Sequence, residues 1–595
     1  MCWLNNQDLK PKAAYTSMIS SISLEQFRDK LKNFKSLEAN NNEELTNSLK
    51  LEETLSAMNI SIDDIENEHQ VICVNFSLPL VAPSGTIVKS RRVLPTTMKQ
   101  VLSQVDIPAL GRGLRKSICI GLLIKHVNSA DSDGREFVFS FAHDHWHSLT
   151  PATTTSVIVI PLFNDTICSF QYTQTSDKQI VTIQKKALYG VTNEFNLNTK
   201  EVTFDAVINK FNTFSAEALK DFRIFASCTE DVKLIGKIAD PINAWGDMFL
   251  IPSTKQAGTK FVLATPTANV HIKGFVAILP ISKTGTINVN IVGYSNAVVV
   301  SNYSIQYDTT VSQNQYYISC DSLDGSTNDG NTVNQTISIT TSSPVMLSFS
   351  MPTSSISGLE TDEPCDFYCW EEYLTFMPIP SKPQECNSFL LPLDQVMITN
   401  DFTTRLYISP PNLGANCNEV SQIIIYNADN VKGTDQVIDI ASNSISLLNE
   451  NEIGFSTYNG HIMSTYRFGT TTYERKGATA FGHFAHYVPS VQEWVSGTTQ
   501  FLTLTKNCIL EVYTDLDGSN EDEIQVDGSS INNIEFDRKP LQVFPHKYFQ
   551  FRMEFTTYGL HSFTTGGKYV AYVICKQANG PYSSAGYLTG FNNRK

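Results

Sequence analysis

An alternation of apolar and polar side chains with a period of two constrains the fold of this chain more than any other feature. The alternation is cleanest in segment 549–555, where Phe549, Phe551, Met553 and Phe555 are separated by polar residues. Residues i and i+2 of a strand share one face, so one face of this segment is expected to be buried and the other wet. Similar segments of strand length recur between residues 71 and 575, with almost no amphipathic helix between them. The pattern predicts a mainly β fold of tandem antiparallel β-sandwiches rather than a parallel α/β fold.

The first seventy residues follow a different period. Ser23 precedes Leu24, Phe27, Leu31 and Phe34, which recur at helical spacing, and a second leucine-containing segment spans residues 43–58. A serine followed three residues later by glutamine is typical of a helix start. Residues 1–70 are therefore expected to form a short helical N-terminal arm. Two interpretations stay open: an arm that packs on the body of the protein, or an arm that orders only in an assembly.

Two interruptions of the strand pattern indicate domain edges. A helix-like stretch spans residues 201–219, and Pro378, Pro380 and Pro383 mark a stiff linker because proline has no N–H to give to a strand ladder. A chain of 595 residues suits three or four domains at roughly 100–200 residues each. We expect the arm at 1–70 and three β domains at 71–215, 216–380 and 381–595.

The charge of the chain excludes one class of function. The formal net charge is −15, and no cluster of lysine and arginine residues stands out. A protein that coats nucleic acid through its phosphates needs a basic face or arm, so such binding is disfavoured. No apolar run reaches the roughly 20 residues of a membrane helix, and no membrane span is expected. The first residues do not resemble a secretory signal, so the twelve cysteines are expected to be reduced thiols.

Three segments carry a resemblance to a known family. Residues 270–296 read VHIKGFVAILPISKTGTINVNIVGYSN, an apolar strand, a Lys-Thr-Gly turn and an alternating strand. Residues 343–355 read SPVMLSFSMPTSS, and residues 366–380 read DFYCWEEYLTFMPIP, a strand that runs into prolines. Together they resemble an early strand pair, a later strand and the closing strand of jelly-roll domains in picorna-like virus capsid proteins, such as those of the comovirus and nepovirus group.

The resemblance implies a structural coat protein with tandem jelly rolls. Such a chain assembles with its own copies, and in some viruses with other coat proteins, into a non-enveloped icosahedral virion that encloses the viral genome. Assembly in the host cytoplasm, and packaging of nucleic acid without a basic arm, are then expected. The resemblance indicates neither a host receptor nor a vector.

Two other functions were weighed. Residues 114–129 read LRKSICIGLLIKHVNS and vaguely resemble plant-virus movement proteins, so the first β domain could belong to a polyprotein fragment of that kind. A β-sandwich protein that binds carbohydrate or acts in adhesion is the other alternative. Its sugar-stacking side chains would be aromatic residues in loops: Tyr303, Tyr307, Tyr316, Tyr317 and Trp494.

Two clusters have the residue types of metal sites. His143, His145 and His147 would share one strand face, a spacing suited to zinc or to a pH sensor, but no fourth ligand stands at motif spacing. We favour a polar loop there.

The segment 515–523 is dense in carboxylates, and Asp515, Asp517 and Asp522 are candidate ligands of a structural Ca²⁺. Gly518 stands at the wrong offset for an EF-hand, and an acidic hairpin loop is the favoured interpretation.

No catalytic motif is evident. His483 and His486 lie three residues apart, and Cys365 and Cys369 four apart, without a second pair at zinc spacing. The chain contains no nucleophile elbow, no phosphate-binding loop and no His-Glu-x-x-His sequence. We expect neither enzymatic activity nor a cofactor.

Overall fold

The computed structural model describes two compact units, residues 1–126 and 127–595. In the first unit it describes residues 13–14, 48–49, 73–81 and 113–121. In the second it describes residues 129–594, apart from these segments: 144–148, 206–213, 265–272, 296–297, 312, 322–334, 355–371, 387–392, 414–416, 418–420, 439–442, 448–449, 458–460, 475–478, 505–506, 546 and 581–582. The helical arm expected at 1–70, and Cys365 and Cys369, lie outside the described residues.

The first unit contains a long antiparallel pair. Strand β3 (Cys73–Val81) pairs with β4 (Gly113–Gly121) along its whole length. The two-residue strands β1 (Ala13–Ala14) and β2 (Ser48–Leu49) form a parallel pair.

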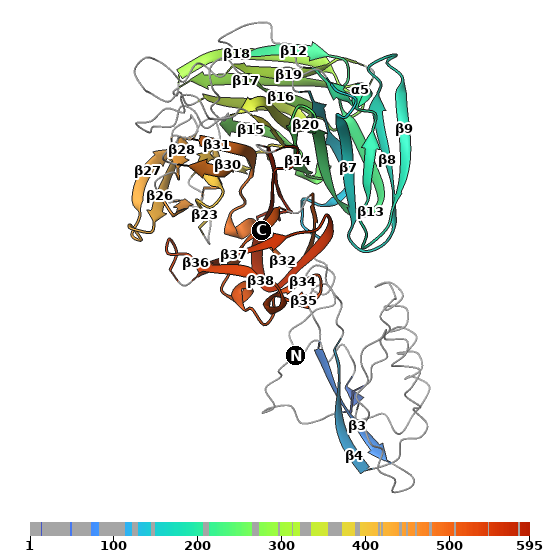
Figure 1. Ribbon diagram of the computed structural model, residues 1–595, viewed down its shortest axis with the longest axis vertical. Helices are drawn as coiled ribbons and strands as arrows, with labels where there is room; N and C mark the ends of the chain where they lie inside the picture. Colours follow the sequence, from blue (N-terminus) through green and yellow to red (C-terminus); the bar gives the residue numbers. More distant parts are fainter. Residues whose placement is uncertain are drawn as a thin grey trace. The chain divides into compact units, whose positions relative to one another are not determined.

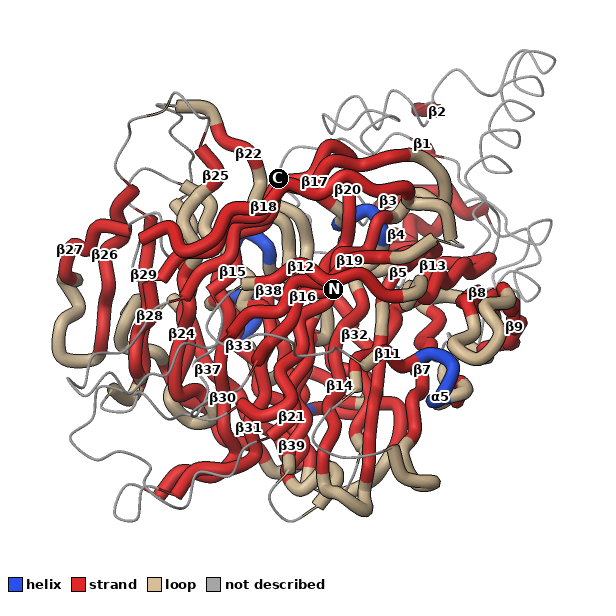
Figure 2. Tube along the Cα trace, turned by 90° about the horizontal axis from the view of Figure 1, so that it is seen from above, coloured by secondary structure: helices blue, strands red, loops and turns tan. Residues whose placement is uncertain are grey.

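The large sheets of the second unit are antiparallel, as the alternation predicts (Figure 1). In the part of this unit that the structure describes, helix is confined to single-turn segments such as α5 (Thr199–Val202), and the tube in Figure 2 is mostly strand and loop. The expectation of a mainly β fold of tandem β-sandwiches is confirmed.

The first sandwich owes its shape to one long, bent strand. The first half of this strand, β13, pairs with β5 and β8, and its second half pairs with β7 and β14. A register shift between Ser227 and Val232 separates the halves, and such irregularities bend a strand. The strands are β5 (Gly134–Phe139), β7 (Thr154–Pro161), β8 (Thr166–Thr173), β9 (Ile180–Ala187), β10 (Glu194–Leu197), β13 (Ile224–Asp240) and β14 (Trp245–Ile251).

The second sandwich repeats this arrangement and has one additional strand. Its long strand β20 pairs with β15 and β17 through the first half and with β16 and β21 through the second. The strands are β12 (Ser215–Leu219), β15 (Gly258–Ala264), β16 (Lys273–Pro280), β17 (Thr286–Ser295), β18 (Val298–Asp308), β19 (Gln315–Asp321), β20 (Gln335–Ser354) and β21 (Glu372–Phe376).

In the third sandwich, two successive strands replace the long one. Strand β29 pairs with β23 and β26, and β30 pairs with β24 and β31. The strands are β23 (Gln395–Thr399), β24 (Thr403–Ile408), β26 (Ser421–Asn427), β27 (Thr434–Ile438), β28 (Asn443–Ser446), β29 (Glu452–Thr457), β30 (Thr465–Glu474) and β31 (Thr479–Tyr487).

The fourth sandwich returns to a single long strand. The first half of β38 pairs with β32 and β34, and its second half with β33 and β39. The strands are β32 (Val495–Thr503), β33 (Cys508–Asp515), β34 (Gln525–Val526), β35 (Ser529–Ser530), β36 (Phe536–Pro540), β37 (Tyr548–Phe555), β38 (Gly559–Lys576) and β39 (Ser584–Leu588).

The described part of residues 127–595 thus contains four sandwiches of one topology in tandem. Their limits differ from the ranges 71–215, 216–380 and 381–595 expected for domains. Residues 224–251 hydrogen-bond into the first sandwich, and residues 395–588 hold two sandwiches. Whether any of these ranges folds by itself stays a prediction.

Two strands that contain uninterrupted apolar runs, β7 and β16, lie between two sandwiches. Val157 and Val159 on β7 face the core of their own sandwich, whereas Ile158 and Ile160 pack with residues of the fourth. On β16, Phe275 and Ala277 likewise pack with the first sandwich, while the alternate residues fill the second. Both faces of these strands are buried, which explains why segments 156–163 and 273–280 lack alternation.

The expectation of reduced thiols is wrong for six cysteines. Cys168 on β8 stands opposite Cys228 on β13, and Cys508 on β33 stands opposite Cys575 on β38. Each pair forms a disulfide, and so do Cys386 and Cys417. The expectation relied on the N-terminal sequence, whereas strand register decides which thiols meet.

Candidate functional site

The last strand of each sandwich meets the last strands of two others. Strand β14 contacts β21, β21 contacts β31, β31 contacts β39, and β39 contacts β14. We call this closed set of four strands the central junction. It joins elements from residues 245 to 588, and it is where the four sandwiches become one body.

Two buried carboxylates bridge the strands of the central junction. Asp247 on β14 accepts hydrogen bonds from the backbone N–H of Met248 (2.7 Å) and from that of Thr375 on β21 (2.9 Å). Glu372 on β21 accepts from the backbone N–H of His483 on β31 (2.5 Å) and of Ser584 on β39 (2.7 Å). Each carboxylate therefore accepts from at least one N–H group on a strand that shares no ladder with its own.

Burial controls the protonation of both carboxylates. It raises the pKa of the Asp247 carboxyl and that of the Glu372 carboxyl well above their usual ranges, against the opposing effect of the N–H donors. The negative charge of Asp247 adds to the rise in the pKa of the Glu372 carboxyl. Two carboxyls with raised pKa values often mark a catalytic pair. Here, however, each is covered by backbone donors and closed off from solvent.

A small cavity lies beside these carboxylates. All four strands of the central junction contribute to its lining, which includes Phe249, Phe376, His486 and Tyr587. His486 is buried, its Nδ1 lies 3.1 Å from the carbonyl oxygen of Tyr487, and its ring stacks on Tyr572 at 4.6 Å. Burial, with the nearby Arg467 charge, lowers the pKa of His486 well below its usual value. The imidazole is thus neutral and packed as an aromatic core residue.

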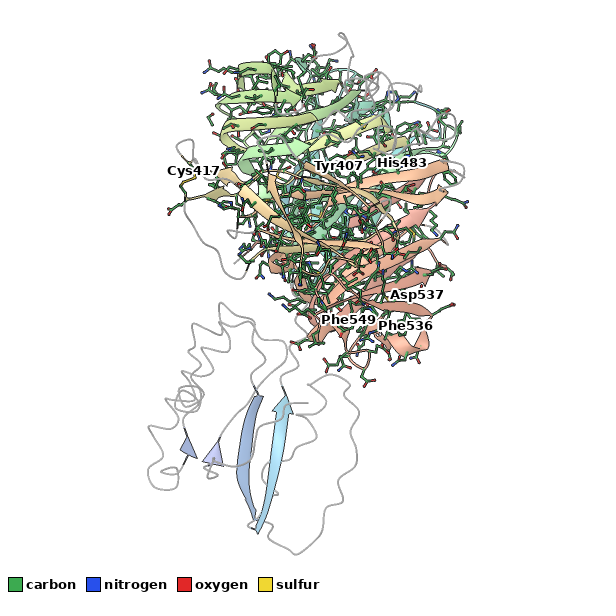
Figure 3. The ribbon with its side chains drawn as sticks, turned by 90° about the vertical axis from the view of Figure 1, so that its left-hand side faces the viewer. Tyr407, Cys417, His483, Phe536, Asp537 and Phe549 are labelled. Carbon is green, nitrogen blue, oxygen red and sulfur yellow. A yellow bond between two sulfur atoms is a disulfide. The ribbon has the colours of Figure 1, made fainter. Side chains whose placement is uncertain are left out.

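A fully buried ion pair joins the third and fourth sandwiches. Nη1 of Arg467 on β30 donates to Glu511 on β33 over 2.6 Å, and neither side chain is exposed to solvent. The other Glu511 oxygen accepts from Tyr513 (2.9 Å) and Gln550 (2.9 Å). His483, which is labelled in Figure 3, stacks on Phe468 with the ring centroids 5.3 Å apart.

Buried ion pairs also tie the first sandwich to its neighbours. Arg223 pairs with Asp221 (2.9 Å) and donates to backbone carbonyls of the second sandwich at Pro280 (2.9 Å) and of the adjoining residue Thr309 (2.8 Å). Lys233 pairs with Asp133 (3.3 Å) and donates to the carbonyl oxygen of Thr589, next to the fourth sandwich. Breaking such a pair is costly because it leaves a buried charge without compensation. These ion pairs therefore help to hold the sandwiches together in one compact unit.

The histidine candidates for a metal site are described only in part. His143 is buried, packs edge-on against Trp245 at 5.9 Å, and lies 3.9 Å from a carboxylate oxygen of Asp205. His145 and His147 lie outside the described residues, so the proposed three-histidine face stays a prediction.

The acidic segment after β33 forms a turn. Asp515 Oδ1 accepts from the backbone N–H of Gly518 (2.8 Å) and from that of Lys568 (3.1 Å). Asp517 begins the short 3-10 helix of residues Asp517–Ser519. Among the described residues, no three histidine, cysteine, aspartate or glutamate side chains, Asp522 included, gather as ligands for one metal ion.

The aromatic residues considered for sugar stacking belong mostly to the core. Tyr307, Tyr317 and Trp494 are buried, and Tyr303 and Tyr316 are half-buried against the main core cluster. A sugar ring would find no exposed face on the three buried side chains.

Comparisons with known proteins give no further constraint. No protein-family model matches the chain, and a search of curated proteins also finds no match. Among the helices of the described residues, none is long and apolar enough to cross a membrane.

Sequence reasoning missed the central junction. It singled out His483 and His486 but gave no role to Asp247 or Glu372. The partners of Glu372 lie 111 and 212 residues away along the chain. Asp247 interrupts the mostly apolar strand WGDMFLI, which was a local signal, whereas Glu372 is the first residue of EYLTF and gives no such signal.

Proposed function

We propose that this chain is a structural coat protein that self-assembles into the closed shell of a non-enveloped virion. The observation that carries the proposal is the fusion of four sandwiches of one topology into a single block. The most strongly perturbed carboxyls, Asp247 and Glu372, hold this block together rather than facing a substrate. A protein whose two most strongly perturbed carboxyls are internal and structural suits a role as a building unit.

The coat function also implies which molecules the chain binds and where it assembles. The partners are further copies of the chain, with or without other coat proteins, and the genome is enclosed without a basic arm because the net charge is −15. Assembly takes place in the host cytoplasm, and the mature location is the virion. Disulfides persist on virions outside the cell, where the surroundings are oxidising, so the three cystines are compatible with this location.

The test is assembly of the full chain. Purified protein is examined by sedimentation velocity and by negative-stain electron microscopy across a range of salt concentration and pH. Closed particles of uniform diameter are the expected result. A chain that stays monomeric in every condition would overturn the proposal.

A further inference from the structure

Lys233 and Asp133 form a lysine–carboxylate pair that is closed off from solvent. Their side chains are 2 % and 3 % exposed, and Nζ of Lys233 lies 3.3 Å from Oδ1 of Asp133. In every other lysine–carboxylate pair of the described residues, the lysine side chain is at least 20 % exposed. The two further pairs that are fully buried contain arginine, whose guanidinium stays protonated and is no nucleophile.

Backbone hydrogen bonds hold both partners in place. Lys233 stands within β13, where the strand pairs with β7. Asp133 lies in a turn, in which its N–H donates to the carbonyl oxygen of Ala130 (2.9 Å). The N–H of the preceding residue, Ser132, donates to the carbonyl oxygen of Phe591 (3.0 Å). Two groups that are fixed in contact can react without the entropic cost of meeting, so a slow bond-forming step becomes accessible.

The hydrogen-bond partners around this pair match an amide. Oδ2 of Asp133 accepts from the N–H of Ala130 (3.1 Å), and Nζ of Lys233 donates to the carbonyl oxygen of Thr589. A side-chain amide has one carbonyl oxygen and one N–H, and these two partners satisfy both. An ammonium has three N–H donors, of which two have acceptors among the described residues. Amide formation also removes two charges that burial makes costly.

Burial favours the protonation states that such a reaction needs. Desolvation raises the pKa of the Asp133 carboxyl, against the opposing effect of the Lys233 charge. Transfer of one proton from the ammonium to the carboxylate leaves a carboxylic acid beside a free amine, and the free amine is the nucleophile. The N–H of Ala130 is directed at Oδ2, where negative charge develops as the amine adds to the acid.

A small cavity beside the pair has room for a leaving water molecule. Its volume is about 10 Å³, and its lining includes both Asp133 and Lys233. A cavity of roughly 10–15 Å³ is sufficient for one water molecule. Gln500 and Tyr569 of the fourth sandwich also line the cavity, so the pair lies where the first and fourth sandwiches meet.

We propose that Lys233 and Asp133 become joined by an isopeptide bond, which forms in the folded chain without a cofactor. Nζ bonds to Cγ, the Cγ–Oδ1 bond breaks, and Oδ1 leaves as water with its own proton and one proton from Nζ. Oδ2 becomes the carbonyl oxygen of the amide. The bond links residues that are 100 positions apart in the chain. Unlike the three disulfides, an amide resists the reductants of a cytoplasm. This inference does not depend on the proposed coat function.

The pair of Lys237 and Glu194 shows why contact alone is insufficient. Its Nζ–Oε1 distance is shorter, 2.8 Å, but both side chains reach solvent. Desolvation raises the pKa of Glu194, and hydrogen bonds from Lys237 and Ser156 outweigh that effect and lower the pKa. The carboxylate therefore keeps its charge and the lysine keeps its proton, so no amide is expected there.

The test is mass spectrometry of the full chain. Wild-type protein is reduced, unfolded in urea and weighed intact beside Lys233→Arg, whose side chain keeps the charge but forms no amide. After correction for the substitution, the wild type is expected to be lighter than this variant by one water molecule. The control Lys237→Arg is expected to be lighter by the same amount. A wild type with the full mass of its sequence would overturn the proposal.

Peptide mapping of the wild type identifies the two joined residues. Trypsin does not cleave after a lysine whose amine is acylated, so one branched peptide that contains Asp133 and Lys233 is expected. Complete cleavage after Lys233, or a branch from Lys233 to a different carboxyl, would contradict the proposal. The mapping uses the unmodified chain after unfolding, so its outcome does not depend on a variant that folds.

Discussion

At the residue scale, Glu372 shows how one side chain can serve three sandwiches. It stands on β21, and its two oxygens accept from the backbone of β31 and of β39. An unpaired buried N–H costs about 1–3 kcal/mol, so the carboxylate replaces strand pairing where the ladders stop. The carboxylate accepts the hydrogen bonds that backbone carbonyl oxygens accept within a strand ladder. A local sequence pattern therefore does not reveal this role.

Removing this carboxylate tests that role. We expect Glu372→Ala to lower the free energy of unfolding by about 3 kcal/mol, because two buried N–H groups lose their acceptor. The readout is the midpoint of urea unfolding followed by circular dichroism. Glu554→Ala on β37 is the control, since Glu554 is exposed and its loss should change stability by less than about 0.5 kcal/mol. Equal midpoints for the two variants would show that Glu372 does not hold the junction.

At the scale of the element, the bent long strand decides the architecture. Strands β13, β20 and β38 each belong to both sheets of a sandwich, so each brings four other strands into register. Disulfides link two of these long strands to a neighbouring strand. They involve Cys228 on β13 in the first sandwich and Cys575 on β38 in the fourth. Covalent links between neighbouring strands constrain the unfolded chain and so favour the folded one.

The disulfide in the fourth sandwich gives a prediction for that element. The loop between Cys508 and Cys575 spans 67 residues, and closing a loop of this size contributes up to about 4 kcal/mol. Cys508→Ala/Cys575→Ala is expected to melt at a lower temperature than the wild type in the absence of reductant. Added reductant should bring the wild type down toward the variant. Peptide mapping without reduction provides the direct check, and free thiols at both positions would contradict the assignment.

At the scale of the whole molecule, the central junction couples the stability of the block to pH. The pKa values of Asp247 and Glu372 are raised above those of an unfolded chain, which lie near about 3.9 and 4.3. The folded state therefore binds these two protons more tightly than the unfolded state does. Their contribution to stability is complete below the unfolded pKa values, and it is lost as the pH rises through the folded ones.

This coupling is measurable in the full chain. Urea midpoints are determined for the wild type and Asp247→Asn at intervals from pH 4 to pH 8. The Asp247→Asn midpoint is expected to depend less on pH, because asparagine has no proton to lose at this position. The comparison is between slopes, so a uniform loss of stability in the variant does not affect it. Parallel curves would show that Asp247 does not titrate differently in the folded protein.

The sequence by itself determined the class of fold. Alternation reports which face of a strand is buried, and it does so within a few residues, so segments such as 549–555 identify antiparallel sandwiches without any structure. The apolar run at 156–163 and the strand at 270–279 are visible in the same way. The sequence also indicated the linker at Pro378–Pro383 and the acidic turn at Asp515.

Only the tertiary structure decided how many sandwiches there are, how they join and which edges stay open. The long strands pair with partners distant in the chain, as β5 does with β13, and no local pattern records such pairing. The same holds for Glu372 and for the disulfide partners, whose contacts span 31 residues or more. The physical reason is the distance along the chain over which each property is set. Alternation is a property of neighbouring residues, whereas register, junctions and free edges are set by the closing of the whole chain on itself.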